Sequence, residues 1–137
     1  MLSKRVEKMN DAITTLKQLK DHVDHMVVER EWQEFHTPKN LAMNIVAEAS
    51  ELMEHFLWCS TEQSPVVMAE LRKEIEQELA DVIIAAVAFA NAAHIDIAHA
   101  FERKLQEVKD KYPVDSARGR ADKYTAYATL KKKARSD

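Results

Sequence analysis

Residues 71–90, LRKEIEQELADVIIAAVAFA, decide the fold of this chain. Their apolar side chains recur at steps typical of one helix face: Leu71, Ile75, Leu79, Val82, Ile83 and Ala86. A second stretch repeats this period with Leu41, Ile45, Leu52 and Phe56. That period is typical of an amphipathic α-helix, and no stretch shows the period of two that a half-buried strand requires. The sequence therefore predicts an all-α protein.

A few residues mark where the helices start and end. Thr37-Pro38 and Ser64-Pro65 each place a capping hydroxyl before a Pro at the first helical position, and Asp96 can cap a further start. Tyr112-Pro113 predicts a helix end, because the residue before Pro disfavours helical backbone. We expect a four-helix bundle of the all-α type in residues 1–113 and a partly ordered basic arm in residues 114–137. The expected helices are 3–34, 38–58, 65–93 and 97–112.

Composition excludes several classes of protein. The 137 residues fit one domain, and 46% hydrophobic with 31% charged residues fits neither a disordered chain nor a membrane protein. One Gly cannot build the Gly-rich phosphate loops of P-loop or doubly wound nucleotide-binding folds. No apolar run reaches the roughly 18 residues of a membrane span, and the N-terminus lacks a signal-peptide core. Cys59 alone forms no internal disulfide, so we expect a reducing cytoplasm.

Charge is divided unevenly along the chain. Residues 118–137 carry a net charge of +5, which leaves −8 on residues 1–117. An acidic body disfavours DNA, whose affinity for proteins depends on cationic contacts to phosphate. The acidic residues 1–117 can also concentrate a divalent cation. We expect no nucleic acid and no membrane among the partners.

Two pairs of carboxylates lie in apolar surroundings. Glu48 and Glu51 form one pair, Glu78 and Asp81 the other, and a spacing of three places each pair on one helix face. A carboxylate that points inward is costly unless it is paired or bound to a metal, and hard divalent cations prefer oxygen ligands. A solvated acidic face fits the same spacing. Position by itself leaves both interpretations open.

A di-iron bundle is the rival metal centre, and it requires Glu-x-x-His on two helices. None of the six His has a Glu three residues before it. The nearest approach is Asp96 with His99, and Asp96 is better used as a helix cap. We therefore exclude a di-iron site.

These motifs resemble those of the MazG-like, all-α nucleoside triphosphate pyrophosphohydrolases, especially the branch that contains dCTP pyrophosphatases. Residues 29–40, EREWQEFHTPKN, resemble that branch's E-R-D-W-x-x-F-H-x-P-x-N. Glu48-x-x-Glu51 and Glu78-x-x-Asp81 match the family's metal motif, and Phe56-Leu-Trp58 resembles its F-Q-W. Residues 111–125 resemble the tail of bacterial members. The resemblance covers about residues 20–127.

The resemblance implies a mechanism and a set of site residues. The catalytic and metal-binding residues would be four carboxylates: Glu48, Glu51, Glu78 and Asp81. They would bind Mg²⁺, with Mn²⁺ as a possible substitute, while water attacks the α-phosphorus. Trp32, His36 and Trp58 are candidates for the base pocket, although core packing is the alternative for both Trp. Asn40 is a candidate for hydrogen bonding to base or sugar. Lys104 and Lys111 lie seven residues apart on one helix face and are candidates for the β- and γ-phosphates, although solvated surface lysines are the alternative for both.

Two positions depart from the family pattern. Val108 stands four residues after Lys104, where members usually have Asn, and Ala85 stands where the dCTP-selective animal enzymes have Tyr. These departures leave the metal motif intact. They leave the preference for base and sugar open.

The expected function is an Mg²⁺-dependent nucleoside triphosphate pyrophosphohydrolase of nucleotide house-cleaning, acting on dCTP or on related or modified dNTPs. The alternatives are a catalytically silent helical module that binds nucleotide or protein, and a helical adaptor that uses its basic tail. The apolar run Val82–Ala90 covers the whole circumference of its helix, and 137 residues supply too few neighbours to surround it. We therefore expect a homo-oligomer, with a tetramer favoured over a dimer because of the resemblance.

Overall fold

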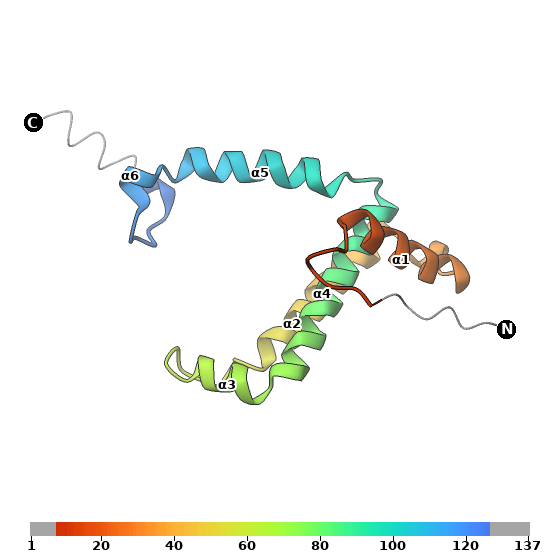
Figure 1. Cartoon of the computed structure of the whole chain (residues 1–137), viewed down its shortest axis with the longest axis horizontal. Helices are drawn as coiled ribbons and strands as arrows, with labels where there is room; N and C mark the ends of the chain where they lie inside the picture. The colour runs from red at the N-terminus through yellow and green to blue at the C-terminus, as the bar shows by residue number, and fades with distance from the viewer. Residues whose placement is uncertain (1–7, 127–137) are drawn as a thin grey trace, which may run out of the picture. The chain divides into compact units, whose positions relative to one another are not determined.

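The computed structural model describes residues 8–126, which contain helices and loops and no strand. The elements, in chain order, are α1 (Leu16–Glu29), the 3₁₀-helix η1 (Gln33–Phe35), α2 (Pro38–Glu54), α3 (Ser64–Glu70), α4 (Arg72–Ala92), α5 (Ile97–Lys111) and α6 (Val114–Ala117) (Figure 1). The prediction of an all-α protein is confirmed. No single helix among these residues is long and apolar enough to cross a membrane, although α4 and α5 pass that test of length and composition when taken together as one broken span.

The chain divides between Ile95 and Asp96 into two compact units. The N-terminal unit contains α1 to α4, and the C-terminal unit contains α5 and α6. The boundary between residues 113 and 114, which was expected from composition and charge, stays a prediction.

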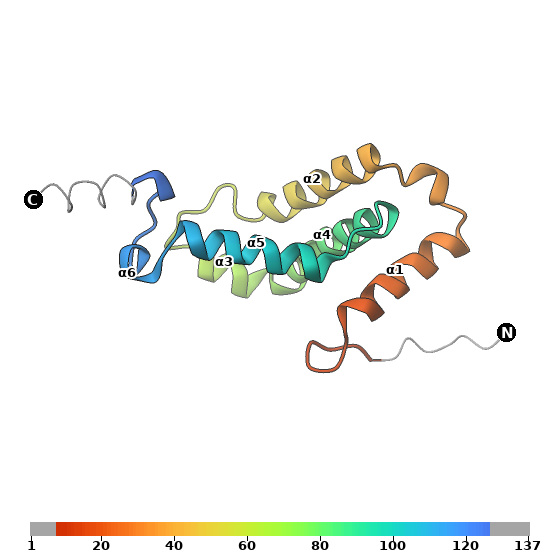
Figure 2. The ribbon, with the colours of Figure 1, turned by 90° about the horizontal axis from the view of Figure 1, so that it is seen from above.

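Helix α4 is the centre of the N-terminal unit. Helix α2 packs along it, and α1 and α3 also contact it (Figure 2). The buried apolar side chains come from three helices, and α4 supplies most of them: Val23 and Val27 of α1, Leu41 of α2, and Ile75, Ala85, Val87, Ala88 and Ala90 of α4. The stretch with the clearest helical period is therefore the helix against which the others pack.

The first helix is shorter than the range 3–34 that the sequence predicts; residues 3–7 of that range lie outside the described residues. Thr15 and Gln18 cap α1 reciprocally, because the Thr15 hydroxyl accepts from the Gln18 amide while the Gln18 side chain accepts from the Thr15 amide. Upstream, the Asn10 side chain accepts from the Ala12 amide at 3.0 Å. Such local bonds compete with helix formation, so residues 11–13 form a turn and residues 8–10, 14 and 15 are irregular.

Two predicted helix starts are confirmed, and the third is displaced. The Thr37 hydroxyl accepts from the Asn40 amide at 3.2 Å, and Asp96 accepts from the His99 amide at 2.9 Å. Ser64, in contrast, is the first residue of α3 rather than its cap. Ser60 and Gln63 bond reciprocally upstream and begin the turn earlier.

The predicted helix 65–93 is interrupted at Leu71. Its backbone torsions of φ −107° and ψ 24° end α3, and α4 begins at the next residue. Hydrophobic periodicity does not detect such a break, because a single residue of altered backbone leaves the spacing of the apolar side chains nearly unchanged. The end of α5 at Lys111, before Tyr112-Pro113, agrees with the prediction.

Asn91 joins α4 to α1, since its side-chain nitrogen donates to the Lys20 carbonyl at 2.9 Å. We expect Asn91→Ala to lower the free energy of unfolding by about 1 kcal/mol, because the partly buried hydrogen bond between α4 and α1 is lost. Urea unfolding followed by circular dichroism measures the change. Asn44→Ala, an exposed substitution on α2, is the matched control. Equal urea midpoints for Asn91→Ala and Asn44→Ala would contradict a stabilising role of the bond from Asn91 to Lys20.

Candidate metal centre

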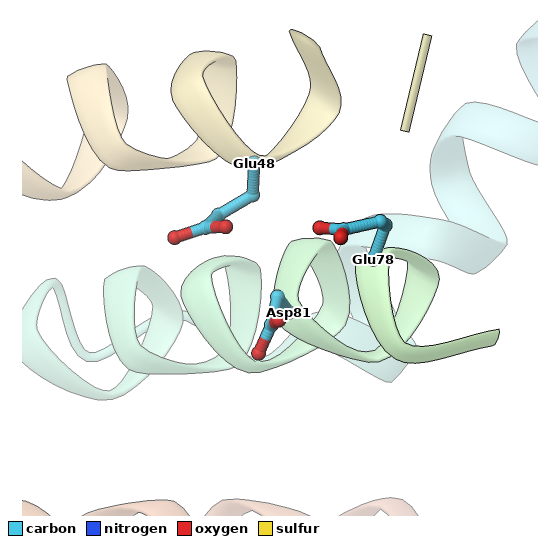
Figure 3. Close-up of side chains that lie close together, drawn as sticks. All are labelled: Glu48, Glu78 and Asp81. Carbon is cyan, nitrogen blue, oxygen red and sulfur yellow. The ribbon is translucent and has the colours of Figure 1, made fainter. Parts of the chain in front are cut away.

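Three carboxylates from two helices meet in the N-terminal unit (Figure 3). Glu48 projects from α2, while Glu78 and Asp81 project from α4, and one oxygen of each lies within 4.8 Å of the others. Glu48 and Glu78 are half-buried, and Asp81 is exposed. The spacing of three along α4 places its two carboxylates on one face, and the packing of α2 brings Glu48 to that face.

Glu51, the fourth predicted carboxylate, lies outside this trio. It is one turn further along α2 and is exposed. Its charge nevertheless acts on the site. Partial burial, followed by the carboxylates of Glu51, Asp81 and Glu78, raises the pKa of Glu48 above its ordinary value of 4.5.

The donor set of the trio fits a hard divalent cation. Among the ion pairs of residues 8–126, none involves Glu48, Glu78 or Asp81, so no cationic side chain is paired with these charges. Carboxylate oxygens are the ligands that Mg²⁺ and Mn²⁺ take in proteins. A bound cation would remove the repulsion that the gathered charges create.

Three predicted site residues gather around η1. Trp32 and His36 lie with ring centroids 6.5 Å apart and planes tilted by 31°, and the Arg30 guanidinium is 5.7 Å from the centre of the Trp32 ring. The Asn40 amide nitrogen donates to the Phe35 carbonyl at 3.0 Å. This bond ties the start of α2 to η1 and fixes the loop that carries both rings.

Neither Trp is part of the core in the described chain. Trp32 is 43% exposed, and Trp58, which follows the end of α2, is 93% exposed. Core packing, the alternative for both residues, is therefore wrong. An apolar ring as exposed as Trp58 is suited to contact with a ligand or with another chain.

A cavity of about 290 Å³ lies next to His36, between α1, η1 and α4. Its lining combines apolar and hydrogen-bonding side chains: Val23, Asp24, Val27, Gln33, His36, Ala88, Asn91, Ala92 and His94. Of the predicted site residues, only His36 is among them. No motif in the sequence indicates Asp24, Asn91 or His94, because segments distant in the chain meet here only through packing.

Lys104 and Lys111 share one face of α5, as predicted, and both pair with Glu107. The Lys104 Nζ lies 3.0 Å from one Glu107 oxygen, and Lys111 donates to the other. Hydrogen bonds from Lys111 and then from Lys104 lower the pKa of Glu107 to about 2. Glu107 in turn raises the pKa of Lys111. The role of both lysines in binding phosphate stays a prediction.

The described part of the basic arm, residues 114–126, makes contacts with the end of α5. The Tyr124 ring lies 5.5 Å from the Lys111 ammonium and packs edge to face against Tyr112 at a centroid distance of 6.3 Å. Gly119, with φ +71°, supplies the left-handed turn that redirects the chain. The segment that resembles the tail of bacterial family members therefore folds back on the helix that precedes it.

Comparison with known proteins gives concordant matches. The sequence profile of the MazG-like family matches residues 43–126. The chain is 38% identical to dCTP pyrophosphatase 1 of Mus musculus over 113 residues and 33% identical to that of Homo sapiens over 114 residues; each alignment covers 81% of this chain. The chain spans 66% of the length of these curated relatives.

A solved structure is also similar. The crystal structure of a pyrophosphatase from Archaeoglobus fulgidus superposes with a TM-score of 0.70 at 34% sequence identity. The match covers 77% of this chain and 99% of that one.

The raised pKa of Glu48 predicts that its charge destabilises the metal-free protein. A group with a raised pKa contributes stability below its unfolded value and loses it as the pH rises through its folded value. At pH 7 Glu48→Gln should therefore raise the melting temperature of chelator-treated protein by roughly 1–3 °C, and below about pH 4 this gain should vanish. Thermal unfolding by circular dichroism measures both.

Glu54→Gln, an exposed substitution on the same helix, is the control for the loss of a charge. An equal rise in melting temperature for Glu48→Gln and Glu54→Gln at pH 7 would show that the loss of any negative charge stabilises the protein, whether or not it belongs to the carboxylate trio.

Proposed function

Because this chain belongs to the MazG-like family, we propose that it is a divalent-metal-dependent nucleoside triphosphate pyrophosphohydrolase, which converts a nucleoside triphosphate to the monophosphate and pyrophosphate. The observation that carries the proposal is the meeting of Glu48, Glu78 and Asp81 from two packed helices. The relatives named dCTP pyrophosphatase 1 support dCTP, or a related or modified dNTP, as substrate. The reaction would remove surplus or non-canonical nucleotides from the cytoplasmic pool.

The carboxylate trio would hold Mg²⁺, or Mn²⁺ in its place. When bound, the cation offsets the charge of the triphosphate, polarises a phosphoryl oxygen and lowers the pKa of a bound water. Glu78 and Asp81 are fixed relative to each other by α4, and Glu48 is positioned by the packing of α2. Glu51 lies outside the trio, and we assign its carboxylate to accept the proton of the attacking water.

The loop around η1 would receive the base. Trp32 and His36 present two ring faces there, and stacking on an aromatic side chain contributes about 1–3 kcal/mol per base. One N–H of the Asn40 side chain bonds the Phe35 carbonyl, so a contact of Asn40 with base or sugar would use its side-chain oxygen or its second N–H. Trp58 follows the opposite end of α2, a helix of 17 residues, so as the further candidate for stacking it would reach the base only from a second copy of the chain.

Lys104 and Lys111 would bind the β- and γ-phosphates. Glu107 already holds both ammonium groups on one face of α5, so a phosphate has to compete with its carboxylate. The bond to Glu107 also places the two cations close together before any ligand arrives. Such an arrangement suits a ligand with several adjacent negative charges, as a triphosphate has.

Apolar side chains of α4 support self-association. Leu79, Ile83 and Ile84 are 48%, 46% and 41% exposed, although they lie in or next to the apolar run of the central helix. Val46 and Met43 of α2 are exposed as well. A second copy of the chain would cover these side chains, and we propose a homo-oligomer with a tetramer favoured over a dimer.

We expect Asp81→Asn and Glu78→Gln each to lower pyrophosphate release from dCTP at least about 100-fold, or about 2.7 kcal/mol in the barrier, because a ligand of the cation is lost. A screen of canonical and modified triphosphates with Mg²⁺, read out as pyrophosphate, measures the activity, and chelation should abolish it. Glu74→Gln, exposed at the start of α4, is the control and should retain activity.

Full activity of Asp81→Asn, or activity after exhaustive chelation, would refute the mechanism. A folded wild-type protein that releases no pyrophosphate from any triphosphate would favour the catalytically silent binding module.

Light scattering coupled to size exclusion tests self-association. We expect a mass that is a multiple of the 15.7 kDa chain, because the exposed apolar face of α4 leaves water when copies associate. A fully active species of 15.7 kDa would show that one chain suffices.

A further inference from the structure

The cavity beside His36 has the chemistry of a site for a flat nitrogen heterocycle. Val23, Val27, Ala88 and Ala92 give it apolar walls. Hydrogen-bonding side chains enter it from α1, η1 and the end of α4. Pockets for small ligands combine an apolar lining with a few convergent polar groups in this way.

One lining residue of the cavity, Asp24, can only accept hydrogen bonds when ionised, and the other polar ones can donate as well. Asp24 contributes a carboxylate, which accepts hydrogen bonds only. Asn91 donates one hydrogen of its side-chain amide to the Lys20 carbonyl at 2.9 Å, so its oxygen and its second N–H can serve further partners. A ligand edge that donates hydrogen bonds is therefore complementary to the side of the cavity that Asp24 lines.

Helix α4 connects the cavity to the carboxylate trio. Asp81 and Ala88 are seven residues apart, so they lie on the same face of the helix about 10.5 Å apart along its axis. Ala85 lies between them on that face. A nucleoside triphosphate with its phosphates at the trio has the length to reach the cavity with its base.

His94 enters the cavity lining from a strained backbone position. Its φ of +54° is in the left-handed region, where helix ends usually have Gly. The backbone bond from the Ile95 amide to the Ala90 carbonyl, at 2.8 Å, closes this helix end. Strain retained at a residue that lines a cavity points to a function for its side chain.

Glu31 provides an internal comparison. It has the same φ of +54° at the end of α1, and its side chain is not part of the cavity lining. Relief of backbone strain at Glu31 and at His94 should therefore have the same effect on stability and different effects on ligand binding.

We propose that Asp24 and His94 determine the base specificity of this protein: the cavity takes the base, and Asp24 accepts a hydrogen bond from an exocyclic amino group such as that of cytosine. Uracil presents a carbonyl oxygen at the same position, which the carboxylate repels. His94 and His36 flank the ring and can donate to its nitrogen or carbonyl acceptors. The inference rests on the proposed function and names the selectivity of the same site.

The test compares kcat/KM for dCTP and dUTP in the full chain with Mg²⁺. In Asp24→Asn the ratio of dCTP to dUTP should fall at least tenfold, because the new amide can donate to the uracil carbonyl. Asp21→Asn removes the same charge from the same helix, from a residue paired with Lys17 and absent from the cavity lining, and should leave the ratio unchanged.

A second pair of variants tests His94. His94→Gly and Glu31→Gly should each raise the melting temperature by a few degrees, since Gly adopts positive φ without strain. Only His94→Gly should raise the KM for dCTP, severalfold, with kcat little changed. A purely structural role of His94 predicts the same KM in both variants.

The outcomes separate the two proposals. If the wild type hydrolyses both nucleotides and Asp24→Asn shifts the ratio no more than Asp21→Asn, the specificity assignment is wrong and the proposed function stands. If His94→Gly leaves KM unchanged, the role of His94 is wrong. If the wild type hydrolyses no nucleotide, the proposed function fails and the specificity assignment fails with it.

Discussion

The repulsion between carboxylates where α2 packs on α4 is the constraint on which the structure depends. Oxygens of Glu48, Glu78 and Asp81 lie within 4.8 Å of one another, and partial burial together with these neighbours raises the pKa of Glu48. The two helices still pack, and each buries an apolar side chain, Leu41 of α2 and Ile75 of α4, whose removal from water favours the folded chain. A cation that binds only the folded protein would stabilise the fold by mass action.

Helix α4 carries two of the three carboxylates and several residues that line the cavity. Glu78 and Asp81 lie near its middle, and Ala88 and Asn91 of the cavity lining lie near its end, so helix geometry sets the distance between the two groups. A rigid element holds functional groups more precisely than a loop does. The loop at η1 gains a similar precision from the bond between Asn40 and the Phe35 carbonyl.

The C-terminal unit has more basic than acidic residues, whereas the N-terminal unit has more acidic than basic ones. Glu107 holds Lys104 and Lys111 together, and its low pKa, about 2, keeps it ionised throughout the physiological range. All three side chains are exposed, so the pairs add little to stability in salt. The pairs hold two ammonium groups on one face of α5, and the Tyr124 ring lies 5.5 Å from the Lys111 ammonium.

Much of the fold could be predicted because it depends on local rules. The helices follow from apolar periodicity, and the starts at Thr37 and Asp96 follow from side chains that cap the next turn. The two helix starts that were predicted wrongly also depend on local bonds. The side chain of Asn10 forms one such bond upstream of α1, and the side chain of Gln63 forms another with Ser60 upstream of α3. The break at Leu71 has no such marker, because periodicity is insensitive to one residue of altered backbone.

By itself, the sequence determined that Glu78 and Asp81 lie on one face of a helix, because a spacing of three within a helix sets their distance. It also determined that Glu48 and Glu51 form a second such pair. Only the tertiary structure decided that Glu48, rather than Glu51, meets the other pair, since that depends on how α2 is rotated against α4. For the same reason only the tertiary structure brought Asp24, His36 and His94 to one cavity: their distances are set by packing between helices and not by spacing along the chain.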